Sequence, residues 1–523
     1  DGTPVLATTA TANARVVHDV AEQLGAGGRA VLTVRGGLAR ESLRLGVLRL
    51  PTAEQRLAWL VAHLGDLPGS GIVYTLTVAA ADDLAALLRD GGHDVLSYTG
   101  RTDPADRQAA EDALRRNEVK ALVATSALGM GFDKPDLGFV VHVGAPSSPI
   151  AYYQQVGRAG RATERADVLL LPGSEDRDIW RYFASTSMPR QEQADAVLAA
   201  LAAAPKAMST AALESVVDVR RTRLELLLKV LDVEGAVRRV PGGWTATGEP
   251  WTYDADRYGR VAEARDREQQ LMLDYESTTG CRMAFLQQAL DDGTAEPCGR
   301  CDRCAGPWYL TDVPQGAMEQ AGARLQRTGV EVPARSQWPS GMARLGVPVS
   351  GRIDPGERSA TGRAVARLTD LGWGQRLRQL LDGPDGPVDE AAVRGSISVL
   401  RDWGWVRRPT GVVAMPSRRH GQLLRSLAEG LSNAGRLPLL GSLDLVDGGP
   451  TGEPGGNSAF RLAGVWGRIA VGAPLAAALA AHDGPVLLID DLADSRWTLT
   501  VAVRELRRAG ADEVLPFVLA QAG

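Results

Sequence analysis

The sequence predicts an α/β protein with several domains. The chain has 523 residues, more than one hydrophobic core usually holds, so roughly two to four domains are expected. Between residues 71 and 171, short apolar segments alternate with amphipathic ones. This alternation is typical of a mostly parallel sheet with helices on both faces. A similar pair closes the chain, where the apolar segment 485–491 precedes the amphipathic segment 498–508.

The elements of the first α/β region follow from residue type and spacing. Its apolar segments are short and rich in β-branched and aromatic residues, so we expect strands at 71–76, 94–98, 121–125, 139–143 and 167–171. In two longer segments the apolar residues recur at helical spacing. These segments predict helices at 81–90 and 104–116.

The middle of the chain follows a different pattern. Two short helices are expected at 209–216 and 221–231, followed by a strand at 236–240, a P-G-G turn and a strand at 244–247. This order is a winged-helix pattern. Residues 254–290 predict long amphipathic helices, and residues 308–356 are loop-like with many Gly and Pro.

Composition excludes several protein classes. With 44% hydrophobic and 23% charged residues the chain is neither fibrous nor largely disordered. A formal net charge of −5 excludes a uniformly basic nucleic-acid coat, although a local basic groove remains possible. No apolar run approaches the roughly 18 residues of a membrane span. We therefore expect a soluble, cytoplasmic monomer that does not bind membranes. Because the chain starts at Asp1, apparently partway into a domain, we also expect a fragment or processed chain.

All four cysteines fall within 24 residues, as Cys281, Cys298, Cys301 and Cys304. Two disulfides would be the alternative, but a long chain with no signal segment and no other cysteine disfavours them. Gaps of two residues let neighbouring thiolates surround one ion, which predicts a structural Zn²⁺ site. Closed four-sulfur coordination leaves no place for a catalytic water. We expect Cys281 at the start of a helix.

The segments A-T-S-A-L-G-M-G-F-D-K-P (124–135) and S-P-I-A-Y-Y-Q-Q-V-G-R-A-G-R (148–161) carry the densest group of polar and glycine residues. Gly157 and Gly160 free the backbone so that Arg158 and Arg161 can project from one side. Two guanidiniums suit the oxygens of a terminal phosphate during transfer. A solvated basic turn is the alternative interpretation.

These segments resemble motifs V and VI of superfamily 2 helicases, specifically of the RecQ family. The resemblance extends to T-A-T at Thr9–Thr11 (motif III), to Tyr74 (motif IV) and to the cysteine spacing of the RecQ zinc module, and so covers roughly residues 1–304. It implies that motif V, which contacts nucleotide and nucleic-acid backbone, comprises Thr125, Ser126, Gly129, Gly131 and Asp133. It implies that motif VI comprises Gln154, Arg158 and Arg161, with an arginine finger at Arg158 or Arg161.

The family implies an ATP-dependent 3′-to-5′ DNA helicase of repair and recombination, with ATP and Mg²⁺ in the full-length protein and single-stranded DNA and duplex junctions as partners. A working motor also needs a G-x-x-x-x-G-K-[ST] phosphate loop. Only four of the 58 basic residues are lysines, and none precedes Ser or Thr. The D-E-A-A string at 389–392 does not follow an apolar strand, so we interpret it as unrelated to the family's acidic motif. The chain alone should therefore bind ATP poorly and hydrolyse none.

The winged-helix pattern departs from the family because it precedes the zinc module. Arg220, Arg221 and Arg223 open its second helix and are candidate phosphate contacts, or else a solvated helix end. Residues 317–434 are rich in Arg interleaved with Trp, which suggests a groove where rings stack on bases. A role of these Trp residues in core packing is the alternative.

The C-terminal segment V-L-L-I-D-D-L-A-D-S-R-W-T-L (486–499) resembles the phosphoribosyl-pyrophosphate loop of type I phosphoribosyltransferases. This resemblance implies a ligand pocket formed by Asp490, Asp491, Ser495 and Thr498, with 411–418 as the pyrophosphate loop. Arg496 stands where that family has Gly. A side chain at this position would crowd the phosphate or force a backbone conformation that Gly alone adopts easily. We therefore expect a degenerate pocket that has been reused for DNA or a nucleotide; an ordinary strand end with a solvated acidic pair is the alternative.

Six segments are expected in total. They are the tail of a first RecA-like lobe (1–39), a second RecA-like lobe (40–188), a winged-helix-like domain (189–250), a helical zinc module (251–306), a linker (307–356) and a phosphoribosyltransferase-like domain (357–523). Two other functions stay open at this point: a DNA-binding accessory protein without motor activity, and a phosphoribosyltransferase of nucleotide salvage.

Overall fold

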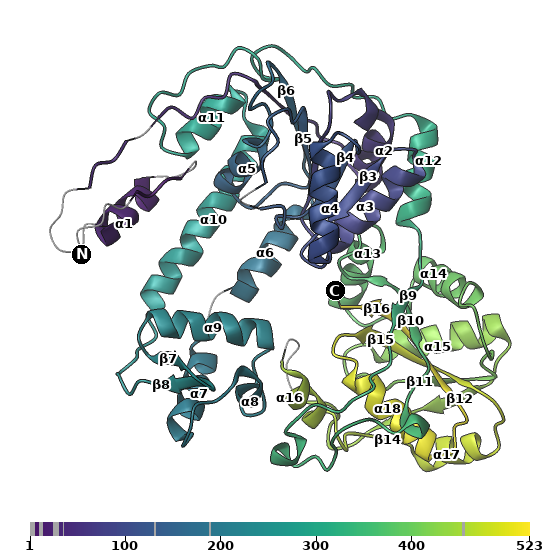
Figure 1. Ribbon diagram of the computed structural model, residues 1–523. Coiled ribbons are helices and arrows are strands. Elements are labelled where there is room, and N and C mark those ends of the chain that lie inside the picture. Colours follow the sequence, from purple (N-terminus) through teal and green to yellow (C-terminus); the bar gives the residue numbers. More distant parts are fainter. Residues whose placement is uncertain are drawn as a thin grey trace. The chain divides into compact units, whose positions relative to one another are not determined.

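The computed structural model describes residues 6–9, 14–24, 31–34, 36–129, 132–187, 190–451 and 456–522 (Figure 1). The chain divides into two compact units. The first unit comprises Asp1–Ser185 and Ala255–Leu325, and the second comprises Thr186–Asp254 and Gln326–Gly523. Each unit has its own mixed or parallel sheet, so the expected α/β class is confirmed.

A six-stranded, fully parallel sheet forms the centre of the first unit, in the order β1-β6-β5-β2-β4-β3. Its strands are β1 (Leu43–Val47), β2 (Gly71–Thr75), β3 (Val95–Tyr98), β4 (Ala121–Ala124), β5 (Phe139–Val143) and β6 (Ala166–Leu171). Five of these strands were expected within one or two residues. The edge strand β1 was not, because its L-R-L-G-V sequence is short and broken by Arg and Gly.

Helices cover both faces of this sheet, as the fully buried central strands require. The helices of the first unit are α1 (Ala14–Leu24), α2 (Ala53–His63), α3 (Val78–Asp90), α4 (Pro104–Arg115), α5 (Pro149–Val156), α6 (Asp176–Ser187), α10 (Ala255–Ser277), α11 (Arg282–Ala289) and α12 (Gln315–Leu325), with the short 3-10 turn η1 (Leu64–Asp66). Helices α10 and α11 return late in the sequence to pack on α5, where the ring of Tyr275 lies 5.1 Å from that of Tyr152.

The second unit begins with three helices and a hairpin. They are α7 (Gln191–Ala203), α8 (Thr210–Glu214), α9 (Arg221–Val233), β7 (Val237–Val240) and β8 (Gly243–Ala246). Met208, which lies between α7 and α8, forms an isolated antiparallel bridge with Trp244 of β8. The helices and hairpin share a small core that includes Leu213, Leu228 and Trp244.

A second six-stranded sheet follows, in the order β12-β11-β15-β16-β10-β9. Its strands are β9 (Val330–Val332), β10 (Gly362–Arg367), β11 (Gly411–Ala414), β12 (Leu439–Ser442), β15 (Val486–Ala493) and β16 (Val514–Gln521), and β13 (Asp444–Leu445) pairs separately with β14 (Ile469–Ala470). Only the edge strand β9 runs antiparallel to its neighbour within the sheet.

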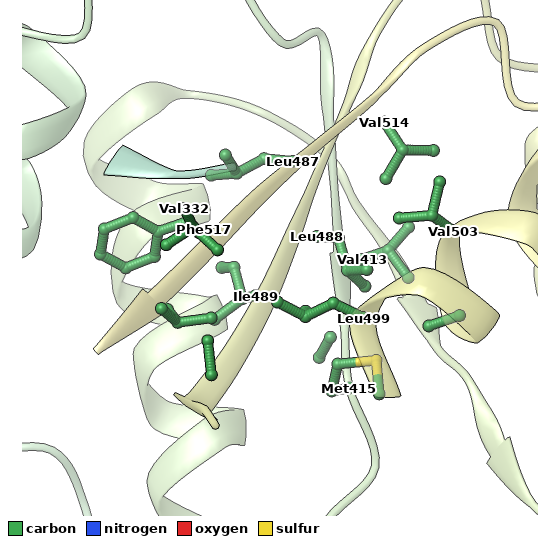
Figure 2. Packing of buried hydrophobic residues seen from close by; sticks show 14 of the residues in the cluster. Val332, Val413, Met415, Leu487, Leu488, Ile489, Leu499, Val503, Val514 and Phe517 are labelled. Carbon is green, nitrogen blue, oxygen red and sulfur yellow. The ribbon is translucent and has the colours of Figure 1, made fainter. Parts of the chain in front are cut away.

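The helices of this part are α13 (Trp373–Asp382), α14 (Glu390–Arg401), α15 (Gly421–Gly435), α16 (Ser458–Ala463), α17 (Ala473–Ala480) and α18 (Trp497–Arg508), with the 3-10 turns η2 (Met342–Leu345) and η3 (Pro355–Glu357). Figure 2 shows Leu499 and Val503 of α18 packing against the same side of the sheet as Val413, while Phe517 and Val332 lie on the other side. The carboxyl ends of β11 and β15, which are adjacent and parallel, therefore open beside the start of α18.

The segment 307–356 is not the unstructured linker that we expected, because it contains a helix and a strand. Helix α12 packs on α2 of the first unit, and β9 joins the second sheet. The many Gly and Pro residues hid both elements, since α12 contains two Gly and β9 has only three residues. Within the described residues, no helix is both long enough and apolar enough to cross a membrane.

Candidate functional site

Helix α5 delivers the Q-x-x-G-R-x-G-R segment. Ser148 caps its start by accepting a hydrogen bond from the amide of Ala151, and the helix ends at Gly157. Gly157 has a helical φ of −65°. Gly160 has a φ of +68°, and a Cβ there would lie 2.4 Å from Ser42 Oγ. Only Gly160 therefore needs the conformational freedom of glycine. We call residues 157–161 the arginine loop.

Four hydrogen bonds join the arginine loop and the residue after it to residues 132–137, at the end of the 124–135 segment and just beyond it. Arg158 Nη1 donates to the carbonyl of Phe132 (3.0 Å), and Arg161 Nη1 to Asp133 Oδ1 (2.8 Å). The two backbone bonds run from Gly160 N to Leu137 O (3.1 Å) and from Ala162 N to Pro135 O (2.8 Å). The two segments singled out in the sequence thus form one surface.

The two arginines have different environments. Arg158 is half-buried near Tyr74, whose hydroxyl has a pKa raised to about 12 by burial, an effect that the Arg158 charge opposes. Arg161 keeps 43% of its side chain exposed while it pairs with Asp133, which is 57% exposed. Arg158 therefore fixes the loop, whereas Arg161 is the guanidinium that a ligand can reach.

The other residues of this predicted site lie close by in the sequence but differ in their exposure to solvent. Thr125 is buried, and its hydroxyl accepts a bond from the amide of Ala127. Ser126 and Gln154 are exposed, and Gly129 is half-buried. Gln155, not Gln154, bonds His142 Nε2 (2.8 Å), and burial lowers the pKa of His142 to about 4. Gly131, and Ala10 and Thr11 of the T-A-T segment, lie outside the described residues.

The four cysteines converge as the spacing predicted. Their sulfur atoms all lie within 4.8 Å of one another, and all four thiols are free. Cys281 is the N-cap of α11, and its Sγ accepts hydrogen bonds from the amides of Ala284 and Cys298. Tetrahedral Zn–S bonds of about 2.3 Å need sulfurs about 3.8 Å apart, so the donor set and its compactness fit one zinc ion.

This cysteine cluster is attached to the edge of the first sheet. Asp302, directly after Cys301, donates its amide to Leu45 O (2.9 Å) and accepts from the amide of Val47 (3.0 Å) on β1. Arg300 donates to the carbonyls of Leu43 and Arg40. Residues 300–302 therefore bond to the free side of the edge strand β1.

Comparison with known proteins identifies this lobe. Residues 55–163 match the family described as the helicase conserved C-terminal domain. The chain is 31% identical over 189 residues to the ATP-dependent DNA helicase RecQ of Bacillus subtilis (36% of this chain, 31% of the relative). Over this lobe the chain is therefore similar to the C-terminal portion of RecQ-family DNA helicases.

Two further relatives are similar to part of the chain. The ATP-dependent DNA helicase RecQ of Synechocystis is 29% identical over 264 residues (48% of this chain, 52% of the relative). The ATP-dependent DNA helicase Q1 of Mus musculus is 33% identical over 175 residues (33% and 27%). The crystal structure of the DEAD-box protein SrmB of E. coli is 26% identical with a TM-score of 0.25, covering 28% of this chain and 86% of that chain. The chain spans about half or less of the length of these curated RecQ relatives.

Outside this lobe, the arginines at the start of α9 are not equivalent. Arg220 Nη2 donates to Asp494 Oδ1 (2.9 Å) of the loop after β15. Arg221 pairs with Glu225 (3.1 Å) on its own helix and is 62% exposed. Burial, together with the charge of Arg190, lowers the pKa of Arg223. Arg220 is therefore engaged within the second unit, and Arg221 is the most exposed of the three arginines.

The C-terminal loop has its polar groups occupied. Asp490 is buried, which raises its carboxyl pKa well above the usual range. Asp491 Oδ2 lies 2.6 Å from Nδ1 of His420. Ser495 O accepts two bonds from the Arg335 guanidinium, and Thr498 is half-buried in the first turn of α18. Because internal side chains engage Asp491 and the Ser495 carbonyl, the loop is closed by the unit's own residues.

Arg496 has the left-handed backbone that the sequence suggested. Its φ is +65°, and its guanidinium donates to Pro333 O (2.9 Å). A left-handed residue with a side chain costs about 1–2 kcal/mol. Arg496 thus has the left-handed backbone that glycine adopts most easily, and it brings a guanidinium to this turn.

The tryptophans of the arginine-rich segment pack inside the second unit. Trp338 stacks on Trp497, with ring centroids 5.9 Å apart, and Trp403 stacks on Trp405 at 4.3 Å. Trp373 donates to Gln326 O. These contacts favour the core-packing interpretation over a row of rings for stacking bases.

Sequence reasoning missed two residues beside the arginine loop. Arg40 and Ser42 hydrogen-bond to its carbonyls, yet they lie in G-G-L-A-R-E-S, which contains neither a motif nor a periodic pattern. Only the pairing of β1 with β6 brings them there.

Proposed function

We propose that the chain is the second-lobe portion of a monomeric, RecQ-type ATP-dependent DNA helicase that unwinds DNA 3′ to 5′ in repair and recombination. The arginine loop carries this proposal, because it presents one exposed guanidinium, Arg161, on a rigid base formed by Arg158. The likeness to DNA helicases named RecQ supports DNA as the partner.

In this proposal Arg161 is the arginine finger and meets the γ-phosphate of ATP. Guanidiniums that neutralise charge in phosphoryl transfer contribute about 10³–10⁵ in rate. Asp133 holds Arg161 in place through the 2.8 Å contact. Gly129, Gly131 and Asp133 border the nucleotide, Gln154 lies one helical turn before the loop, and exposed Ser126 beside Thr125 contacts the DNA backbone. Mg²⁺ and the phosphate loop would belong to a first lobe.

The cysteine cluster would hold one structural Zn²⁺ through Cys281, Cys298, Cys301 and Cys304. The ion would cross-link the cysteine cluster. It would not bind a reactive water, because thiolates would fill all four coordination positions. Asp302 and Arg300 attach the cysteine cluster to β1.

Residues 189–250 would form a winged-helix-like domain that contacts duplex DNA. Three helices, a hairpin and the Met208–Trp244 bridge support this. Arg221 and Arg223 would meet phosphates, and Arg220 would do so only after release from Asp494.

Residues 357–523 would form a phosphoribosyltransferase-like domain without transferase activity. The adjacent parallel strands β11 and β15 and the left-handed Arg496 support the fold. The engaged Asp491 and Ser495 oppose the salvage-enzyme alternative. Calorimetry with phosphoribosyl pyrophosphate is expected to give no heat at millimolar ligand, and saturable heat would restore that alternative.

The decisive experiment compares the ATPase activities of wild type and Arg161→Ala, both in the protein extended upstream to include a first motor lobe. Single-stranded DNA should stimulate hydrolysis, and Arg161→Ala should lower kcat about a thousandfold while DNA binding is kept. Arg165→Ala is the matched control, because Arg165 is exposed, lies four residues after Arg161 and pairs with Asp167 and not with Asp133. DNA binding without stimulated hydrolysis would favour the accessory-protein alternative. Displacement of a strand from 3′-tailed but not 5′-tailed duplexes tests the polarity.

A further inference from the structure

The five residues before β1 lie between the arginine loop and the cysteine cluster. We call Leu38–Ser42 the tether. One guanidinium nitrogen of the tether, Arg40 Nη2, donates to Gly157 O (2.9 Å) and to Ala159 O (3.3 Å). Ser42 Oγ donates to Gly160 O (2.6 Å). Three of the five carbonyls of the arginine loop are therefore bonded by two side chains of the tether.

These bonds fix the path of the loop on both sides of Arg158. Arg40 bridges the carbonyls that precede and follow Arg158 by one residue, which sets the curvature of the turn. Ser42 bonds the left-handed Gly160, directly before Arg161. Hydrogen bonds from a charged donor are stronger than those from a neutral one, so losing Arg40 removes the strongest of these restraints.

The tether is held in turn from its other side. Leu38 N donates to Asp292 Oδ2 (2.7 Å), and Leu38 O accepts a bond from Tyr153 of α5. Arg300, between Cys298 and Cys301, donates to Arg40 O (3.1 Å) and Leu43 O (3.3 Å). The backbone of Arg40 is thus fixed by the cysteine-rich segment while its side chain fixes the arginine loop.

We propose that Arg40 and Ser42 are positioning residues for the Arg161 finger, and that Arg300 orients Arg40. This proposal rests on the proposed function for its catalytic consequence. The tether is also the segment through which the chain enters the second lobe from residues 1–37. A displacement of the tether therefore reaches Arg161 through the side chains of Arg40 and Ser42.

The first test uses hydrogen exchange of the chain itself. The amides of Arg158, Ala159, Gly160 and Ala162 are all hydrogen-bonded, so they report the order of the loop. Arg40→Ala should raise their exchange rates about tenfold, Arg40→Lys less, and Ser42→Ala mainly that of Gly160. Arg49→Ala is the control, because Arg49 is 60% exposed and lies beyond the tether. Unchanged exchange in Arg40→Ala would overturn the proposal.

The second test uses ATP hydrolysis by the extended protein. Arg40→Ala should lower kcat about tenfold or more, with the KM for ATP and the affinity for single-stranded DNA within about twofold, because the finger acts in the transition state. In an Arg161→Ala background Arg40→Ala should cause no further loss, and an additive loss would overturn the positioning role. If Arg161→Ala itself left hydrolysis unchanged, Arg161 would not be the finger and the proposed function would fail. The hydrogen-exchange measurement would still test whether Arg40 and Ser42 order the arginine loop.

Discussion

Arg282 and Asp302, the residues that directly follow Cys281 and Cys301, form a buried ion pair with 2.5 Å between Nε and Oδ1. Their side chains are 1% and 4% exposed. The second carboxylate oxygen of Asp302 accepts from Val47 N and from the Tyr309 hydroxyl. One buried carboxylate therefore joins the two ends of the cysteine module to the sheet.

Removing this carboxylate should destabilise the first unit. Asp302→Ala leaves the Arg282 charge buried without its partner, and breaking such a pair costs about 3–5 kcal/mol. Denaturant unfolding monitored in the first unit measures the loss. The neighbouring Arg303→Ala, an exposed site, is the control and should change stability by less than about 0.5 kcal/mol. Equal stability of both variants would contradict the structural role of the pair.

Removing metal should loosen β1 as well as the cysteine module. We expect about one zinc per chain by metal analysis, and a chelator should lower the melting temperature and speed amide exchange at Val47, which bonds to Asp302. Cys301→Ser, which removes the buried ligand, should mimic the chelator. A zinc content well under one per chain would rule out the site.

Charge reversal should reveal the link between the start of α9 and the loop after β15. Arg220→Asp and Asp494→Arg should each lower the stability of the second unit, and the double variant should recover about 0.5–1 kcal/mol, as expected for a partly exposed pair. Arg461, which lies 3.4 Å from Asp494, will keep the recovery incomplete. Arg221→Asp is the control and should show no coupling to Asp494.

The pair between His420 and Asp491 should make stability depend on pH. His420 Nδ1 faces the carboxylate and Nε2 faces Leu381 O, so both nitrogens meet acceptors and the imidazolium is favoured. The hydrogen bond to Asp491 raises the pKa of His420 above 6.5. The stabilisation is therefore full below about pH 6.5 and is lost as the pH rises through the raised value.

Denaturant unfolding of wild type and His420→Gln at pH 5.5, 7 and 8.5 measures this effect. The stability difference should be largest at pH 5.5 and smallest at pH 8.5. His482→Gln, which removes a histidine elsewhere in the same unit, should show no such trend, and a difference that grows with pH would contradict the imidazolium assignment.

Local signals predicted much of this molecule, and long-range contacts account for what they missed. Five of the first six strands and the cysteine cluster follow from spacing over a few residues. Strand β1 and Arg40 do not, because their roles depend on partners more than 100 residues away. Asp491 stays a predicted pocket residue, and its contact with His420, 71 residues away in the sequence, is visible only in the fold. The left-handed backbone of Arg496 agrees with its sequence position, where the phosphoribosyltransferase loop that this segment resembles has Gly.

The first unit is discontinuous in the sequence, and this bears on the order of its assembly. Residues 186–254 belong to the other unit, so α10, α11 and the cysteine module are synthesised after an intervening folding unit. Until residue 302 has left the ribosome, the outer edge of β1 lacks its hydrogen-bond partners and the apolar side of α5 lacks its cover. A nascent chain or a truncation ending near residue 188 therefore exposes a sheet edge and an apolar face, both of which favour aggregation.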